Sequence, residues 1–167
     1  VVAAYGQIIS REVLDLVDWP LNIHGSLLPD YRGAAPINWA VINGEEETGA
    51  TTMIMDEGMD TGPILLKQST EIGIKETAGE IHDRLAEMGS ELILETIQKI
   101  DRGTIEPRPQ PDEGTLAPKL EKSDGKIDWE NNAKKIHDKI RGMNPWPKAF
   151  TFFRGNRITL LESYPQG

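Results

Sequence analysis

A proline-rich segment divides the sequence and limits what it can fold into. Residues 105–121 contain four of the eleven prolines and few hydrophobic residues. Because proline lacks a backbone N–H and has a fixed φ, neither a helix nor a central strand can continue through such a segment. This composition is typical of linkers. We therefore expect a domain over residues 1–104, a linker over 105–121 and a second unit over 122–167.

The start of the first unit has the pattern of an α/β fold. A short apolar strand is predicted at residues 1–4, a helix at 7–17 and a second strand at 21–24. A strand, a helix and a strand in this order favour a parallel pair. A proline at the start and apolar residues at helical spacing predict a further helix over residues 36–42.

The rest of the first unit is predicted to contain a strand pair and a long helix. Residues 50–55 and 64–68 indicate two antiparallel strands, joined by a loop rich in aspartate and glycine. Thr77 and Glu80 form the pattern of a capping box, and Gly103 is a good stop signal. Apolar residues repeat along one face of this helix at positions 81, 85, 88 and 92.

The second unit is predicted to be smaller and mixed. Residues 126–129 indicate a strand, 133–141 a helix, and 149–153 with 157–161 a hairpin that turns at Gly155-Asn156. Residues 133–167 carry seven basic side chains against two acidic ones, whereas the whole chain has a net charge of −9. The basic excess could face an anion, or it could be a solvated surface.

Composition excludes several classes of site. The sequence has no cysteine, which rules out disulfides and thiolate metal sites and fits a reducing compartment, so we expect a cytoplasmic protein. The apolar stretches fall short of the roughly 20 residues that a membrane helix needs. The three histidines lack metal-ligand spacing, and we expect no metal. No phosphate-binding glycine loop is present.

The densest group of chemically useful side chains follows the second predicted strand. Asn22 and His24 are two residues apart, so in a strand they lie on the same face, where the strand ends. An amide can stabilise an oxyanion and an imidazole can transfer protons at neutral pH, which together suit acyl transfer to an amine. Asp60, in the loop between the antiparallel strands, is the best candidate for a carboxylate that orients the imidazole.

Each of these residues also has a purely structural interpretation. A histidine at a strand end is often a satisfied structural residue, Asn22 could cap a turn, and Asp60 could shape its own loop. His82 and His137 are predicted on polar faces of helices and interpreted as surface residues. Spacing alone therefore leaves the chemical and the structural interpretations open.

Longer motifs resemble a known family. The runs NIHGSLLPDYRGAAPINW (residues 22–39), ETGATTMIMDEGMDTGPIL (47–65), KIDW (126–129) and IRGMNPWP (140–147) are similar to methionyl-tRNA formyltransferases. This resemblance covers almost the whole chain. It implies the C-terminal part of a Rossmann-like α/β formyltransferase domain, followed by a linker and the start of a small OB-like β-barrel domain.

The resemblance also implies roles for individual residues. It places the catalytic residues at Asn22, His24 and Asp60. It places the folate site at Ser26, Leu27, Leu28 and Pro29 and, through backbone groups, at Tyr5, Gly6, Gln7, Ile8 and Ile9. The implied cosubstrate is 10-formyltetrahydrofolate, the implied partner is the initiator methionyl-tRNA, and the intact enzyme is expected to be a monomer without a membrane or metal partner.

Related formyltransferases remain as alternatives. The glycinamide ribonucleotide enzyme shares the motif around His24 but has proline in place of Gly25 and lacks the second unit. The aminoarabinose formyltransferase is similar around Asn38-Trp39 and residues 146–150, and the formyltetrahydrofolate hydrolase domain is a further relative. Residues 32–37 and 144–147 favour the tRNA enzyme.

The family resemblance also indicates parts that have no counterpart in this sequence. The family's earlier strands, its tRNA-binding loop and most of its barrel have no counterpart here. The chain is therefore expected to be a fragment, and a folded but inactive fragment or binding module is a further alternative, because part of a sheet exposes a strand edge.

Overall fold

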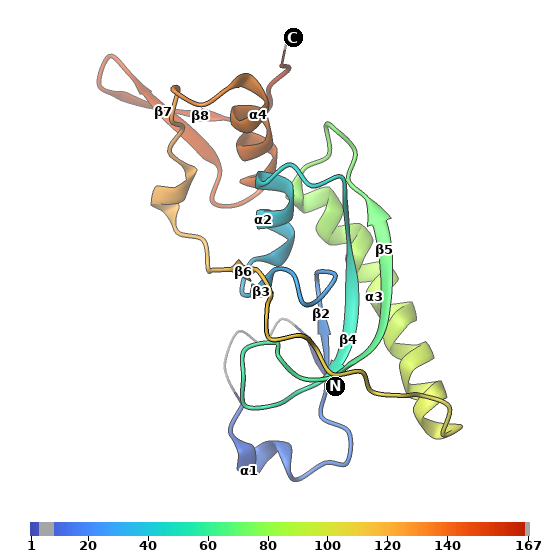
Figure 1. Cartoon of the computed structure of the whole chain (residues 1–167). Helices are drawn as coiled ribbons and strands as arrows, with labels where there is room; N and C mark the ends of the chain where they lie inside the picture. Colours follow the sequence, from blue (N-terminus) through green and yellow to red (C-terminus); the bar gives the residue numbers. More distant parts are fainter. Residues whose placement is uncertain (4–8, 166–167) are drawn as a thin grey trace.

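A four-stranded mixed sheet forms the centre of the first unit (Figure 1). The computed structural model describes residues 1–3 and 9–165. The strand order is β1 (Val2–Ala3), β2 (Leu21–His24), β4 (Glu47–Ile54) and β5 (Ile64–Glu71). β1 is parallel to β2, whereas β4 is antiparallel to both β2 and β5. The predicted parallel pair, the predicted antiparallel pair and the α/β class are confirmed.

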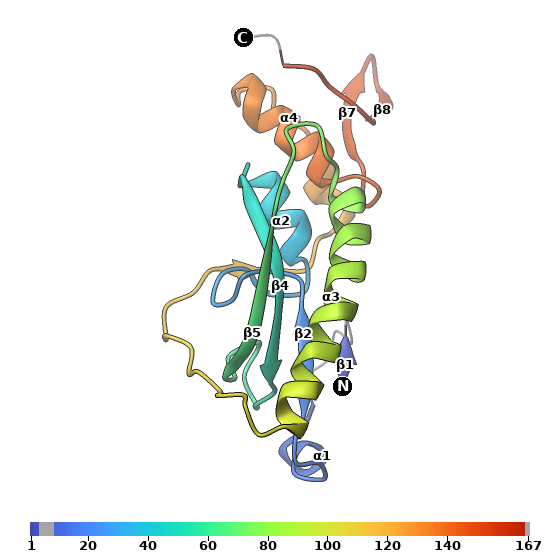
Figure 2. The ribbon, with the colours of Figure 1, turned by 90° about the vertical axis from the view of Figure 1, so that its right-hand side faces the viewer.

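One face of the sheet is covered by the long helix α3 (Ala78–Asp101), as Figure 2 shows. The capping box of Thr77 and Glu80 is present, and Gly103 follows the helix with a φ of 63°. Gly89 allows close packing, since a Cβ there would lie 2.7 Å from the Cδ1 of Ile23 in β2. The prediction for this helix is confirmed.

The helix predicted over residues 7–17 is wrong in length. α1 spans only Arg11–Leu14, and residues 7 and 8 lie outside the described part of the chain. Val13, Leu16 and Val17 are exposed, so no packed apolar face extends the helix, and packing is the main source of helix stability in proteins.

The proline-rich linker is ordered against the first unit. β6 (Leu116–Ala117) within it pairs in parallel with β3 (Arg32–Gly33). Just after β3 comes α2 (Pro36–Ile42), which has the predicted bounds. Figure 2 shows the linker on the opposite side of the sheet from α3, where it passes the loop between β4 and β5. The linker is therefore part of the wall around that loop.

The second unit contains a short 3-10 helix η1 (Lys122–Gly125), the helix α4 (Ala133–Gly142) and a hairpin of β7 (Ala149–Phe153) and β8 (Asn156–Leu160). The predicted helix and hairpin are confirmed. The turn is shifted by one residue: its central residues are Arg154 and Gly155, with φ of 49° and 79°. Two positive φ angles suit a primed hairpin turn, and Asn156 pairs with Phe153 instead.

The strand predicted over residues 126–129 is not formed. Only an isolated bridge joins Lys126 to Phe150, and the backbone N–H of Ile127 donates to the Phe150 carbonyl over 2.8 Å. The chain then turns, because the Asp128 side chain accepts from the Glu130 backbone N–H. This local hydrogen bond competes with continued pairing.

An apolar cluster joins the two units, where α2 packs against α4. Its buried members are Leu120, Ile127, Ile140, Met143 and Ala149. Beside it lies a buried ion pair in which Arg141 donates to Asp138 over 2.8 Å. We call this set, with the half-buried side chains around it, the α2–α4 junction.

His137 corrects a prediction. His137 was predicted to be a surface residue but is only 5% exposed, whereas His82 is exposed as expected. One ring nitrogen of His137 lies 2.7 Å from the Ile74 carbonyl and the other 2.8 Å from the Ser163 hydroxyl. The face of α4 that carries His137 packs against the loop after β5, a contact that the helical pattern alone does not indicate.

Candidate active site

Asn22 and His24 lie on the face of β2 that points away from α3. Ile23, between them, packs against Gly89 of α3, and side chains alternate along a strand. His24 is 6% exposed and Asn22 is half-buried. The sheet pairs Asn22 with Val2 and Met53, so its backbone is held on both sides. The predicted pairing of an amide and an imidazole on one face is present.

The ring of His24 is oriented by the backbone of Tyr31. Its Nε2 lies 2.9 Å from the Tyr31 carbonyl oxygen, which can only accept, so Nε2 carries the proton. In the neutral ring the lone pair is then on Nδ1. The proton-accepting atom of His24 is therefore defined by the loop that follows β2.

Nδ1 of His24 faces Asp60. The Asp60 Oδ2 is 3.7 Å from Nδ1 and accepts a hydrogen bond of 2.8 Å from the Gly33 backbone N–H. At 3.7 Å the two atoms form no direct hydrogen bond, and they are an ion pair only when the ring is protonated. The Asp60 side chain is 18% exposed, so the carboxylate lies mostly within the protein. Asn22, His24 and Asp60 thus lie around one region beside β2.

The route of the β4–β5 loop makes this arrangement unexpected. β4 is antiparallel to β2, so Ile54 at its end pairs with Leu21, at the start of β2 and not at His24. The loop must fold back along the sheet to bring Asp60 to His24. Asp60 has a φ of 56°, a conformation that side-chain-bearing residues adopt at a cost of about 1–2 kcal/mol. Other contacts must hold it there.

In the segment Ser26–Pro29 after His24, two side chains are buried and two are partly exposed. Ser26 and Leu28 are fully buried, and Leu28 packs in an apolar cluster with Met53 and Ile64. Leu27 and Pro29 are half-buried. Of the side chains predicted to line a folate site here, only those of Leu27 and Pro29 are partly exposed.

Hydrogen bonds brace this segment from inside. The Ser26 hydroxyl donates to the Asp30 carbonyl over 2.5 Å, and the Thr51 hydroxyl donates to the Ser26 carbonyl over 2.6 Å. Thr51 also accepts from the Leu28 backbone N–H. Ser26 thus has a structural role. Tyr5, Gly6, Gln7 and Ile8, predicted for the same site, lie outside the described residues, and Ile9 is half-buried.

Two groups near the site have shifted pKa values. Burial, together with a hydrogen bond to Glu45, raises the pKa of Tyr31 to about 12. Burial lowers the pKa of Lys67, whose ammonium donates to the Leu28 carbonyl. Tyr31, whose hydroxyl donates to Glu45, therefore stays a neutral phenol well above physiological pH.

Sequence reasoning missed two residues at the site. Gln110, in the linker, donates from Nε2 to the carbonyls of Asp60 and Gly62 over 2.9 and 2.7 Å. Arg32, 7% exposed, donates to the Gln110 Oε1 over 2.9 Å. The only signal in the sequence was a polar residue between two prolines, which by itself predicts a solvated linker.

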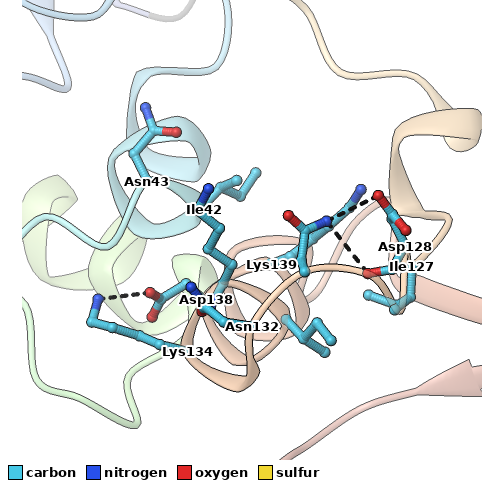
Figure 3. Close-up of a pocket in the computed structure, with 11 residues that line it drawn as sticks. Ile42, Asn43, Ile127, Asp128, Asn132, Lys134, Asp138 and Lys139 are labelled. Carbon is cyan, nitrogen blue, oxygen red and sulfur yellow. Dashed lines mark hydrogen bonds and ion pairs between the residues drawn. The ribbon is translucent and has the colours of Figure 1, made fainter.

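A surface hollow lies elsewhere, beside the α2–α4 junction (Figure 3). It is lined by Ile42 and Asn43 at the end of α2 and by residues in and before α4, including Lys134 and Lys139. Lys134 pairs with Asp138 over 2.9 Å. None of Asn22, His24 and Asp60 lines this hollow, so it is separate from the candidate site.

Residues 1–3 and 9–165 lack two features that define other classes of protein. Within them, no three or more histidine, aspartate or glutamate side chains are placed to hold a metal ion. None of the helices in these residues combines the length and apolar character that crossing a membrane requires.

Known proteins resemble this chain in sequence and in fold. A methionyl-tRNA formyltransferase of Acetivibrio thermocellus is 54% identical over 95% of the chain, which covers 51% of that protein. A 4-N formyltransferase from Francisella tularensis has the same fold, with a TM-score of 0.82 at 23% identity over 96% of this chain and 68% of that one. HypX from Aquifex aeolicus, solved with tetrahydrofolic acid, has a TM-score of 0.73 at 26% identity over 87% of this chain and 26% of its own.

The chain spans about half the length of the curated relatives it matches. The family model described as formyl transferase matches residues 1–97, and the model described as the formyl transferase C-terminal domain matches residues 119–167. Together with the mixed sheet and the side chains around His24, these matches show that the chain belongs to the formyl transferase family.

Proposed function

We propose that this chain takes part in transferring a formyl group from 10-formyltetrahydrofolate to the amino group of initiator methionyl-tRNA. The observation that carries the proposal is the placement of His24 Nδ1 beside Asp60, on the same strand face as Asn22. Relatives named methionyl-tRNA formyltransferase at about half identity support the acceptor, and the HypX structure with tetrahydrofolic acid supports the folate. The reaction belongs in the cytoplasm, since its acceptor is a tRNA of translation initiation.

The proposed chemistry is addition followed by elimination. The methionyl nitrogen bonds to the formyl carbon, whose oxygen becomes an oxyanion. The bond between that carbon and N10 of the folate then breaks, and the proton lost by the amine passes through water to N10. Asn22 donates its amide N–H to the oxyanion. On its way to N10 the proton is taken up by His24 Nδ1, which has the lone pair and then donates to the oxyanion; Nε2 cannot do this, because its proton is held by Tyr31.

Asp60 has two proposed tasks. Its carboxylate, 3.7 Å from His24 Nδ1, stabilises the positive charge of a protonated ring and accepts a hydrogen bond from the proton-carrying water. The hydrogen bond from Gly33 keeps one carboxylate oxygen directed at the ring. None of these steps uses a metal.

For the folate we propose the segment Ser26–Pro29 and the backbone of residues 5–9 as binding elements. Ser26 and Leu28 are buried, so their contribution is to shape the backbone, whereas Leu27 and Pro29 contact the cosubstrate. Lys67, which donates to the Leu28 carbonyl, braces this segment.

We further propose the division into a catalytic domain over 1–104, a linker over 105–121, and the start of an OB-like barrel over 122–167. The basic side chains of the last part would face the tRNA backbone. Arg141 is excluded from this role, because it is buried and paired with Asp138. Exposed lysines such as Lys135 remain available.

A second candidate is an inactive fragment that associates through apolar surface. Leu16 is 80% exposed and Phe153 is 59% exposed. Exposed apolar side chains of this kind favour association. Light scattering of the purified chain, together with a formyl-transfer assay, distinguishes the two proposals. A monomer that transfers formyl groups would rule out an inactive, associating fragment.

The direct test supplies 10-formyltetrahydrofolate with one acceptor at a time: methionyl-tRNA, an amino-sugar nucleotide, or water alone. The full gene product that contains this chain is used. We expect formyl transfer to methionyl-tRNA. Transfer only to the sugar nucleotide would instead support a sugar formyltransferase, and release of formate without an acceptor would support a hydrolase.

A further inference from the structure

The loop that carries Asp60 has little local reason to adopt its observed shape. It begins beside the start of β2, folds back toward His24 and places Asp60 in the left-handed region. Within the loop, the Asp56 carboxylate accepts from the Gly58 N–H and the Thr61 hydroxyl. The Thr61 bond ties the residue after Asp60 back to the start of the loop, and the Ile54 N–H donates to the Pro63 carbonyl over 2.9 Å where the loop closes. Neither bond holds the carbonyls of Asp60 and Gly62, which accept from outside the loop.

Gln110 supplies the missing contacts. A single amide nitrogen donates to two loop carbonyls, 2.9 Å to that of Asp60 and 2.7 Å to that of Gly62. The backbone carbonyls on both sides of Thr61 are therefore tied to one point on the linker. Such a bridge fixes the direction of the peptide planes around Asp60, and hence of its side chain.

Arg32 holds Gln110 in the orientation that this bridge requires. The Gln110 Oε1 accepts from Nε and from a terminal nitrogen of Arg32, at 3.3 and 2.9 Å. Because a guanidinium can only donate, it selects the amide orientation with the oxygen toward Arg32 and the nitrogen toward the loop. Arg32 also donates to the carbonyls of Pro111 and Asp112, which anchors the linker next to Gln110.

The linker is tied to the protein on both sides of Gln110. Before it, Arg108 and Ile64 exchange two backbone hydrogen bonds of 2.8 Å, just after the Asp60 loop. After it, β6 pairs with β3, whose Gly33 N–H donates to the Asp60 carboxylate. Arg32 and Gly33 are consecutive, so one strand contacts both the bridging amide and the carboxylate.

We propose that Gln110, oriented by Arg32, is a positioning residue that holds Asp60 at His24. The proline-rich linker then has a second task besides joining the two units, because it completes the support of the candidate active site. This inference rests on the proposed function for its effect on catalysis, but the loop contacts themselves can be tested without any activity.

The main test replaces Gln110 by glutamate in the full gene product. Gln110→Glu keeps the shape and the oxygen that faces Arg32, but places an acceptor opposite the two loop carbonyls. We expect kcat for formyl transfer to fall about 10- to 100-fold, the scale of a small misplacement of a catalytic group. KM for the folate should change less than threefold. Gln98→Glu, the same change on the exposed side of α3, should leave kcat unchanged.

A double-mutant cycle asks whether Gln110 acts through Asp60. In an Asp60→Asn background, Gln110→Glu should lower kcat less than threefold further, since the group that it positions is already lost. If the kcat losses of the two single variants multiply in full in the double variant, the proposal is overturned. Arg32→Lys, which keeps the charge but not the planar fork, should give part of the Gln110→Glu defect.

Hydrogen exchange provides a readout that needs no substrate. In Gln110→Glu and in the neutral Gln110→Met, the Gly33 amide should exchange at least tenfold faster than in the wild type, because Asp60 no longer accepts from it steadily. Unchanged exchange in both variants would overturn the proposal. A wild type that transfers no formyl group to any acceptor would instead reject the proposed function and leave this test valid.

Discussion

The surroundings of Asp60 and the α2–α4 junction are held together in different ways. Around Asp60, hydrogen bonds link the loop to Gly33 and Gln110, which are distant in sequence. At the junction, apolar side chains such as Met143 and Ile140 are buried together and need only their bulk to fit. The first region depends on the directions of its hydrogen bonds, whereas the apolar part of the second depends on volume. Changes in the first should therefore affect chemistry, and changes in the second should affect stability.

His24→Ala tests the first half of this comparison with the largest expected effect. Loss of a proton-transferring imidazole typically lowers the rate by about 100- to 10,000-fold. The melting temperature should fall much less than the rate, because the prediction assigns His24 to the reaction. Single-turnover kinetics together with thermal unfolding measure both. A rate that falls less than threefold in a folded protein would make His24 structural; His82→Ala is the exposed control.

Asn22→Ala should give the next largest loss of kcat. Removal of one oxyanion donor costs about 100- to 1,000-fold in kcat. The melting temperature should change little, because Asn22 is half-buried and held by its backbone pairing. Single-turnover kinetics together with thermal unfolding check this. A loss below threefold in a folded protein would remove Asn22 from the site; Asn131→Ala, in the second unit, should have no effect.

Met143→Ala tests the junction. Met143 is 1% exposed, and truncating a buried methionine costs about 2–5 kcal/mol of unfolding free energy. Formyl transfer per folded molecule should stay within twofold, since Met143 does not contact the candidate site. Urea unfolding and activity corrected for the folded fraction measure the two quantities. The exposed Leu94→Ala provides the control, and a selective loss of kcat in Met143→Ala would break the comparison.

Glu76→Gln should give the smallest effect, with a defined pH dependence. A hydrogen bond from Arg84 lowers the pKa of the Glu76 carboxyl below its ordinary value. A lowered pKa contributes stability above the unfolded value of about 4.3, and this contribution disappears as the pH falls through the folded value. We expect the wild type to be more stable by less than about 1 kcal/mol at pH 7, because the pair is partly exposed.

Urea unfolding at pH 7 and at pH 3 tests this sign. The difference between wild type and Glu76→Gln should be larger at pH 7 than at pH 3. A difference that grows on acidification would contradict the assigned cause.

Local patterns predicted the regular elements well where an apolar face and an end signal coincide. The long helix has both, in the Thr77 cap and the stripe through Leu85 and Leu92, and its bounds follow from them. Within the described residues, the helix predicted at 7–17 spans only Arg11–Leu14, and Val13, Leu16 and Val17 are exposed. The strand at 126–129 failed because Asp128 bonds locally.

The candidate site was predicted in part. The spacing of Asn22 and His24 predicted that they share one face, since side chains along a strand alternate between its two faces. Asp60 came from the family resemblance, and its closeness to His24 depends on a loop that folds back. Gln110 and Arg32 could not be predicted, because nothing in a proline-rich segment indicates which distant carbonyls its amide contacts.

Neighbouring residues and long motifs were enough to predict most of the secondary elements, the shared face of Asn22 and His24 and the family resemblance. Which ring nitrogen of His24 is free, how Asp60 comes close to it and how the linker contacts the Asp60 loop depend on the folded chain. The physical reason is that hydrogen bonds between remote segments act over about 3 Å and in fixed directions, so they exist only after the chain is folded.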